Sequence, residues 1–162
     1  MDIEYKPFPQ KSELYAYLCE NLRAIARETR DETAILANAS ALLAMELRDV
    51  NWAGFYLLKN GRLVLGPFQG KPAVAEIAIG QGVCGTAAET KRVQRVENVH
   101  RCCNHIACDL ATNSEIVVPI LRADGSLCGV IDIDSPVLSR FDAEDEAGLL
   151  SAAEILAGVF GR

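Results

Sequence analysis

Apolar side chains recur every three or four positions along two stretches near the start of the chain. The first stretch follows Ser12, which we expect to cap a helix, and its apolar positions are Leu14, Leu18, Leu22 and Ile25. The second starts at Asp31 and keeps the same spacing as far as Leu47. Because residues three and four apart lie on one face of an α-helix, this pattern predicts two consecutive amphipathic helices.

The pattern then changes to short apolar and aromatic runs bounded by turn residues, which is typical of β-strands. Strands are expected at residues 52–58, 62–65, 75–79 and 92–96. Asn60-Gly61 separates the first two runs and is a strong hairpin signal. Gly80 and Gly82 end the third run, and residues 83–90 are expected to form a short helix.

The last third of the chain contains one segment with no regular pattern, at residues 97–113. An irregular segment of that length inside a compact domain is usually functional. Two more strands are expected at 115–121 and 127–133, and a last helix from an Asp142 cap to about Phe160. This order of elements predicts an α+β architecture, an antiparallel sheet covered by helices. No repeat or linker divides the chain, so residues 1–162 are expected to form a single domain.

Charge and hydropathy exclude two classes of partner. The net charge is −6 and the sequence pI is about 4.9, and the basic residues are scattered, which argues against nucleic-acid binding. No run approaches the roughly 18 apolar residues of a membrane span. The first nine residues hold two acids and two prolines where a secretory signal needs an apolar run. We therefore expect a cytoplasmic protein that binds no membrane.

Six cysteines dominate the candidate chemistry, and in a reducing compartment they favour redox chemistry, metal binding or simple burial over structural disulfides. Cys84 falls in the first turn of a predicted helix, where the helix dipole favours the thiolate. Cys108 lies near two histidines, which favour the thiolate in the same way. Two such thiols within reach of each other suit sulfenic-acid chemistry that ends in a disulfide, although buried cysteines are common enough for burial alone to explain both. Cys19 and Cys128 are interpreted as structural.

Metal binding is the next alternative. Five thiol and imidazole side chains occur within nine residues of the irregular segment: His100, Cys102, Cys103, His105 and Cys108. Zinc prefers such ligands, but no CxxC pair and no second ligand cluster accompany them. We expect no bound metal or cofactor, and keep a zinc-responsive or redox-responsive binding protein as an alternative function.

Carboxylates and aromatic side chains form a further predicted constellation. Asp132 and Asp134 are two apart near a strand end and share one face of a regular strand. Glu115 begins the preceding strand, so a hairpin would bring the three acids together. Trp52 and Tyr56 are four apart and also share a face. Such a group would suit a cationic substrate or a proton donor with a raised pKa.

Seven blocks of the sequence, taken in order, resemble the free methionine-R-sulfoxide reductases. The blocks are NWAGFY (51–56), LGPFQGKPA (65–73), GQGVCGTAA (80–88), NVH (98–100), HIACD (105–109), SEIVVP (114–119) and IDIDSP (131–136). The resemblance implies a stand-alone GAF-type domain, commonly a homodimer, with a sheet of about six antiparallel strands. It also implies reduction of the free amino acid rather than of methionine sulfoxide within proteins.

The resemblance implies a role for each matching residue. Cys108 would attack the sulfoxide and become a sulfenic acid, a second thiol would form a disulfide with it, and thioredoxin would reduce that disulfide. The substrate would be held by three carboxylates, two aromatic side chains and backbone N–H groups of the segment that ends at Cys108. These substrate-binding residues are Glu115, Asp132, Asp134, Trp52, Tyr56, Ile106 and Ala107.

One position departs from the family pattern. Reductases of this family typically carry a third cysteine ten residues before the position of Cys84, where this chain has Val74. Cys84 therefore becomes the expected resolving thiol, with Cys102 and Cys103 as alternatives. A non-catalytic GAF-type sensor that binds a small ligand in the same pocket is the main alternative to an enzyme.

Overall fold

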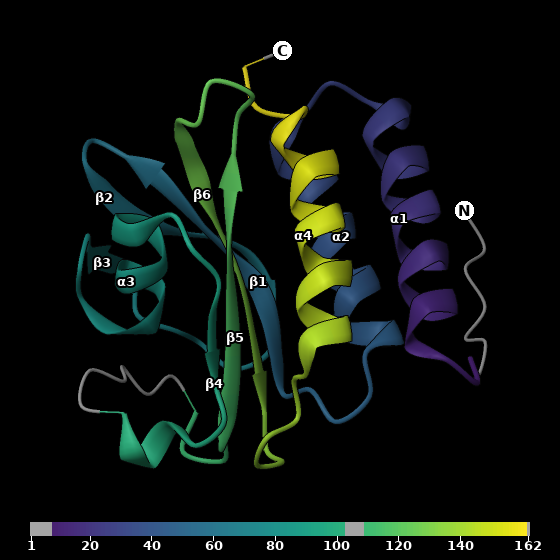
Figure 1. Cartoon of the computed structure of the whole chain (residues 1–162). Helices are drawn as coiled ribbons and strands as arrows, with labels where there is room; N and C mark the ends of the chain where they lie inside the picture. Colours follow the sequence, from purple (N-terminus) through teal and green to yellow (C-terminus); the bar gives the residue numbers. More distant parts are fainter. Residues whose placement is uncertain (1–7, 103–108, 162) are drawn as a thin grey trace.

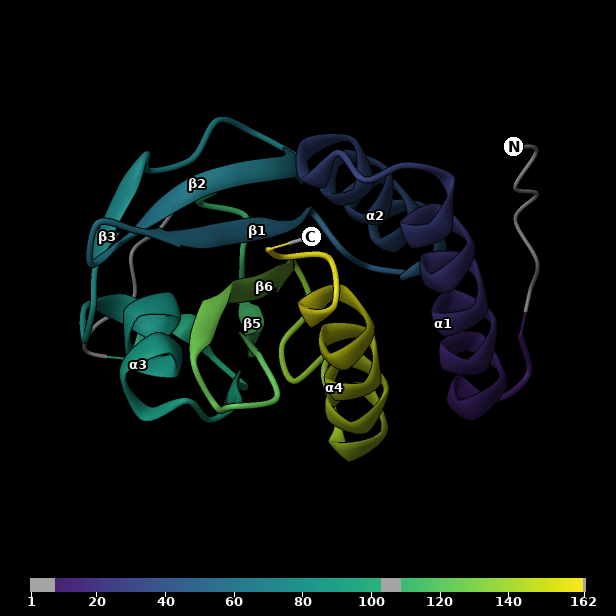
Figure 2. The same ribbon diagram turned by 90° about the horizontal axis from the view of Figure 1, so that it is seen from above.

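The computed structural model describes residues 8–102 and 109–161, which form one six-stranded sheet flanked by helices on both faces (Figures 1 and 2). The strands are β1 (Trp52–Lys59), β2 (Arg62–Gln69), β3 (Glu76–Ala78), β4 (Gln94–Val96), β5 (Ser114–Leu121) and β6 (Leu127–Ser135). The helices are α1 (Lys11–Glu28), α2 (Glu32–Glu46), α3 (Gly82–Thr90) and α4 (Ala143–Ala157), with a 3-10 turn at Val99–Arg101. The strand order is β3-β2-β1-β6-β5-β4, and every neighbouring pair is antiparallel. The predicted α+β class is therefore confirmed.

The helices divide unequally between the two faces. Helices α2 and α4 lie on one face of the sheet and α1 covers them as an outer layer, whereas α3 lies on the opposite face (Figure 2). The central strands β1, β5 and β6 are consequently buried on both sides over most of their length. Because side chains alternate along a strand, one set of positions builds the core under α2 and α4 and the other set faces α3. The second set carries the candidate chemistry.

Most predicted elements occur where the sequence places them, with two corrections. Ser12 does not cap the first helix, because the cap is Gln10, two residues earlier, and the helix starts at Lys11. Strand β2 continues to Gln69, although Gly66-Pro67 reads as a break, because β1 and β2 shift register between Gly54 and Tyr56. Such a bulge lets a strand continue past residues that cannot follow a regular ladder.

A buried carboxylate ties α1 to α4 at the start of the last helix. Asp145 is 1% exposed and accepts hydrogen bonds from the Tyr15 hydroxyl (2.8 Å), Lys11 Nζ (2.6 Å) and Arg140 (3.3 Å). The predicted cap Asp142 is confirmed, and it forms a capping box with Asp145. Within the described residues, no helix has both the length and the apolar character needed to cross a bilayer.

Candidate active site

Strand register brings the predicted carboxylates onto one face of the sheet. Glu115 of β5 pairs with Asp134 of β6, and Asp132 lies two residues before Asp134. In the neighbouring strand β1, Trp52 pairs with Asp134 and Gly54 with Asp132. Residues opposite each other in an antiparallel pair point to the same side, so the predicted convergence of the three acids is confirmed. All three are buried, at 4 to 5% exposure.

Cys84 lies against this acidic face from the first turn of α3. Gly80 and Gly82 have positive φ angles of 86° and 63°, which side chains disfavour, and they form the turn that starts the helix. The Cys84 sulfur and one oxygen each of Glu115 and Asp132 lie within 4.8 Å of one another. A cavity of about 10 Å³ lies between them, which is room for one water molecule but not for an amino acid.

The pKa of the Cys84 thiol is shifted in the opposite direction to that expected from the sequence. Burial first, then the charges of Asp132 and Glu115, raise the pKa of the Cys84 thiol well above its ordinary value. The expected stabilised thiolate at Cys84 is therefore wrong in this structure, because desolvation and two neighbouring acids outweigh one helix N-terminus. The thiol instead donates a hydrogen bond to the Asp132 carboxylate.

The acids also hold protons. Burial and then the neighbouring carboxylates raise the pKa of Glu115, Asp132 and Asp134 well above the ordinary range. Glu115 and Asp132 share a hydrogen bond, which two carboxyl groups make only when one of them is protonated. The site thus stores at least one carboxylic proton beside a protonated thiol.

This proton storage predicts a pH-dependent stability. Between the ordinary carboxyl pKa of about 4 and the raised value, the folded protein holds a proton that the unfolded chain has lost, so the free energy of unfolding falls as pH rises. The slope reaches about 1.4 kcal/mol per pH unit for each such proton. Asp132→Asn removes one titrating group, so its stability relative to the wild type should increase with pH. Urea unfolding at several pH values measures this difference. A pH-independent difference for Asp132→Asn would contradict the prediction.

Aromatic rings form a wall beside the acids. Trp52 stacks on Tyr56 with ring centroids 6.1 Å apart and on Phe68 at 5.1 Å. The Trp52 indole donates to the carbonyl of Lys71 (3.1 Å), and the Tyr56 hydroxyl donates to the carbonyl of Val74 (2.8 Å). The predicted shared face of Trp52 and Tyr56 is confirmed. Phe68 was not singled out from the sequence, because its position depends on the β1–β2 bulge.

Several hydrogen bonds hold Asp109, the first residue that the structure describes after 103–108. Its carboxylate accepts from Lys71 Nζ (3.0 Å), the Ala111 backbone N–H (2.9 Å) and the Asn51 amide (3.2 Å). The Ala111 N–H and then Lys71 lower the pKa of Asp109. Asn51, Lys71 and Asp109 belong to three of the seven blocks that match the family, and Ala111 lies two residues after Asp109. These hydrogen bonds anchor Asp109, which directly follows Cys108 in the sequence, a role that local sequence patterns did not reveal.

The other predicted site residues fall into two groups. Cys103, His105, Ile106, Ala107 and Cys108 lie outside the described residues. Cys102, a candidate alternative resolving thiol, is half-buried and packs against the hydrophobic cluster that contains Cys84. The His100 ring is exposed and hydrogen-bonds the Asn113 side chain (2.8 Å), in keeping with a scaffold residue.

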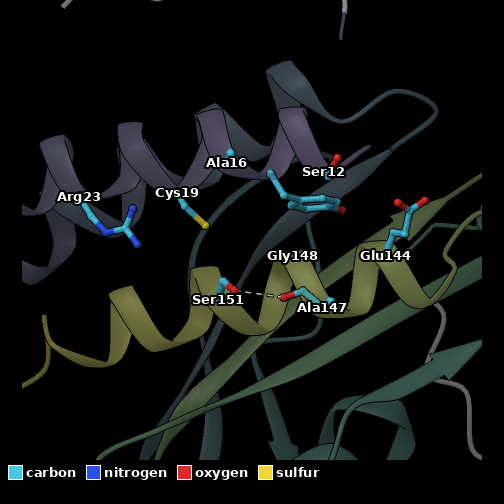
Figure 3. A pocket seen from close by; sticks show the side chains of 9 residues that line it. Ser12, Ala16, Cys19, Arg23, Glu144, Ala147, Gly148 and Ser151 are labelled. Atoms are coloured by element: carbon cyan, nitrogen blue, oxygen red, sulfur yellow. Dashed lines mark hydrogen bonds between the residues drawn. The ribbon is translucent and has the colours of Figure 1, made fainter. Parts of the chain in front are cut away.

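The remaining two cysteines lie across the sheet from Cys84. Cys128 belongs to the core under α2 and α4. Cys19 lines a groove between α1 and α4 and points from α1 towards α4 (Figure 3). Burial raises the pKa of both thiols. Neither lies near the acidic face, so they serve as internal references for experiments on Cys84.

Comparison with known proteins gives concordant matches. The GAF domain family matches residues 21–159. The free methionine-R-sulfoxide reductase of Escherichia coli is 53% identical over 139 residues, which cover 86% of this chain and 84% of the relative. The Saccharomyces cerevisiae protein of the same name is 40% identical, over 95% of this chain and 89% of the relative. An X-ray structure of the Neisseria meningitidis free methionine-R-sulfoxide reductase with its substrate aligns with a TM-score of 0.91 at 37% identity, covering 98% and 95% of the two chains.

Proposed function

The chain belongs to the GAF domain family and, within it, to the free methionine-R-sulfoxide reductases, and we propose that it reduces free L-methionine-R-sulfoxide to L-methionine through its cysteine thiols. The observation that carries this proposal is the buried cluster in which Cys84 contacts two proton-holding acids beside a wall of aromatic rings. Reduction of a sulfoxide by thiols consumes two thiol groups and releases water, and a neighbouring carboxylic acid can deliver the proton that the departing oxygen needs.

The first chemical step is assigned to Cys108. Its thiolate forms a bond to the sulfoxide sulfur while the sulfoxide oxygen takes up a proton. The resulting hydroxyl group passes from the methionine sulfur to the Cys108 sulfur, the transient S–S bond and the original S–O bond both break, and methionine leaves with Cys108 as a sulfenic acid. Asp132 and Glu115 are suited to supply the proton, since burial raises the pKa of both and the hydrogen bond between them requires a proton on one of the two.

The second step is assigned to Cys84. Its thiol condenses with the Cys108 sulfenic acid, which forms a disulfide and releases water. Two observations support this division of work. A thiol with a raised pKa is a poor first nucleophile, and the hydrogen-bonded Asp132 carboxylate is placed to accept its proton when the disulfide forms. Cys102, which packs on the same cluster, is the second candidate for this step.

Specificity for the free amino acid follows from the charges around the site. The substrate ammonium would be held by Asp134 and Glu115, its carboxylate by backbone N–H groups of residues 106–108, and its S-methyl group by Trp52 and Tyr56. A methionine sulfoxide within a protein has no free ammonium or carboxylate group. Its neutral peptide groups would therefore leave the buried acids without a cationic partner. Asp134 Oδ1 is buried without a partner among the described residues, which suits a bound ammonium.

The full cycle needs an external reductant and a compartment that keeps it reduced. We propose that thioredoxin reduces the disulfide, that no cofactor is bound, and that the protein works in the cytoplasm as a homodimer.

A coupled assay tests the proposal. Protein supplied with thioredoxin, thioredoxin reductase and NADPH should oxidise NADPH on addition of free L-methionine-R-sulfoxide, because each sulfoxide reduced consumes one disulfide reduction. The S epimer and an N-acetylated, C-amidated R-sulfoxide should give at most the blank rate. Binding of methionine or its sulfoxide without turnover would favour a sensor and contradict the proposal.

A further inference from the structure

The cluster of Cys84, Glu115 and Asp132 has the composition of a metal site as well as of a reductase site. One sulfur and two carboxyl oxygens come from α3, β5 and β6, and all three lie within 4.8 Å of one another. Around a tetrahedral zinc ion, neighbouring ligand atoms are about 3.5 Å apart, given bond lengths of about 2.0 to 2.3 Å. Shifts of about an ångström would therefore bring the three atoms into coordinating positions.

Two features of the surroundings point to a small ligand between these side chains. The cavity of about 10 Å³ is lined by all three of them and holds one water-sized particle. Asp132 lines this cavity at 5% exposure, and its Oδ1 atom is buried without a hydrogen-bond partner among the described residues. A buried oxygen left unpaired is costly, and an ion in the cavity would satisfy it.

The donor set selects the kind of ion. Mg²⁺ and Ca²⁺ prefer oxygen ligands alone, whereas one thiolate with two carboxylates suits a borderline-soft ion such as Zn²⁺. Three buried acidic groups also lie close together here, and no Lys, Arg or His side chain is among the described residues that line the cavity. A divalent cation removes the repulsion between their ionised forms.

We propose that the reduced protein binds one Zn²⁺ ion through Cys84, Glu115 and Asp132, with a fourth position open to water, and that bound zinc excludes the sulfoxide substrate. Binding expels the Cys84 thiol proton and the proton that Glu115 and Asp132 share, so one ion enters and about two protons leave. Disulfide formation at Cys84 removes the sulfur ligand, so oxidised protein does not hold the ion. Zinc binding is independent of the proposed function; the inhibition and the loss of the ion on disulfide formation rest on it.

Direct titration tests the proposal. Chelator-treated protein, reduced with a phosphine that does not bind zinc, is titrated with ZnCl₂ by calorimetry in two buffers of different ionisation enthalpy. We expect one ion per chain and release of about two protons. Asp132→Asn and Glu115→Gln should each weaken binding by about 10²-fold or more, since even residues that only orient a ligand are worth 10- to 100-fold. Absence of stoichiometric binding to the wild type would overturn the proposal.

Matched variants separate this site from its alternatives. Asp134→Asn changes a buried acid of the same face that is not a proposed ligand, and Cys108→Ser changes a thiol of the segment rich in cysteine and histidine. Both should keep wild-type zinc affinity. If Cys108→Ser loses binding while Asp132→Asn keeps it, the ion is held by the irregular segment and the proposal is wrong.

Two further measurements exclude misfolding and connect binding to activity. Co²⁺ in place of Zn²⁺ should give a sulfur-to-metal charge-transfer band of the strength expected for a single thiolate, and Cys84→Ser should lack it while unfolding cooperatively. In the reductase assay, Zn²⁺ should raise the apparent KM for the sulfoxide without changing kcat. Zinc binding in a protein without reductase activity would uphold this site and refute only the proposed function.

Discussion

Cys108→Ser should abolish turnover of free methionine-R-sulfoxide, with kcat/KM reduced by at least about 10³-fold in the thioredoxin-coupled assay. A serine hydroxyl is almost fully protonated at neutral pH and cannot take the sulfoxide oxygen as a thiolate does. The loss should appear in a single turnover without thioredoxin as well, because no sulfenic acid forms. Methionine released per mole of reduced protein, measured by chromatography, checks this point.

The matched controls for this variant are Cys19→Ser and Cys128→Ala. Both remove thiols on the far side of the sheet, so both should keep wild-type kcat/KM even if the unfolding temperature falls. Wild-type turnover by Cys108→Ser would exclude Cys108 as the nucleophile. Cys84 would then be the first thiol to test in that role.

Cys84→Ser should separate the two chemical steps. We expect the coupled steady-state rate to fall by roughly 10²-fold or more, because the Cys108 sulfenic acid has no partner with which to form the disulfide that thioredoxin reduces. A single turnover should still release close to one equivalent of methionine. The sulfenic acid left on Cys108 should then react with dimedone, and mass spectrometry of the digested protein would locate the adduct.

The choice of resolving thiol depends on the same experiment in two other variants. Cys102→Ser and Cys103→Ser should retain steady-state turnover if Cys84 resolves. If Cys84→Ser turns over normally and Cys102→Ser does not, Cys102 rather than Cys84 resolves the Cys108 sulfenic acid. The disulfide found after one turnover of the wild type would show the same assignment independently.

Local sequence patterns predicted the acidic face well. Asp132 and Asp134 are two apart, and side chains in a strand alternate with a period of two, so their shared face followed directly. Only a short turn separates their strand from the one that begins near Glu115, which made an antiparallel pair the natural arrangement. Where a position depends on strand period and a short connection, the sequence contains enough information.

Features that depend on burial or on contacts between distant parts of the chain could not be predicted from local sequence patterns. The helix N-terminus at Cys84 suggested a thiolate, but the pKa of a thiol depends on everything packed around it, and two acids from other strands reverse the expectation. Phe68 joins the aromatic wall only because a bulge shifts the register of its strand. Lys71 and Asp109 are 38 positions apart, and the sequence around neither residue predicts their ion pair.

The deep burial of Cys84 has a consequence for survival under oxidative stress. Peroxide and electrophiles attack thiolates that they can reach, and progressive oxidation to sulfinic and sulfonic acids is irreversible for most cysteines. Cys84 is 4% exposed and holds its proton, so it is shielded on both counts. It becomes reactive only towards a sulfenic sulfur brought directly against it. On the proposed mechanism, the protein thus keeps its resolving thiol in a form that the surrounding oxidants do not destroy.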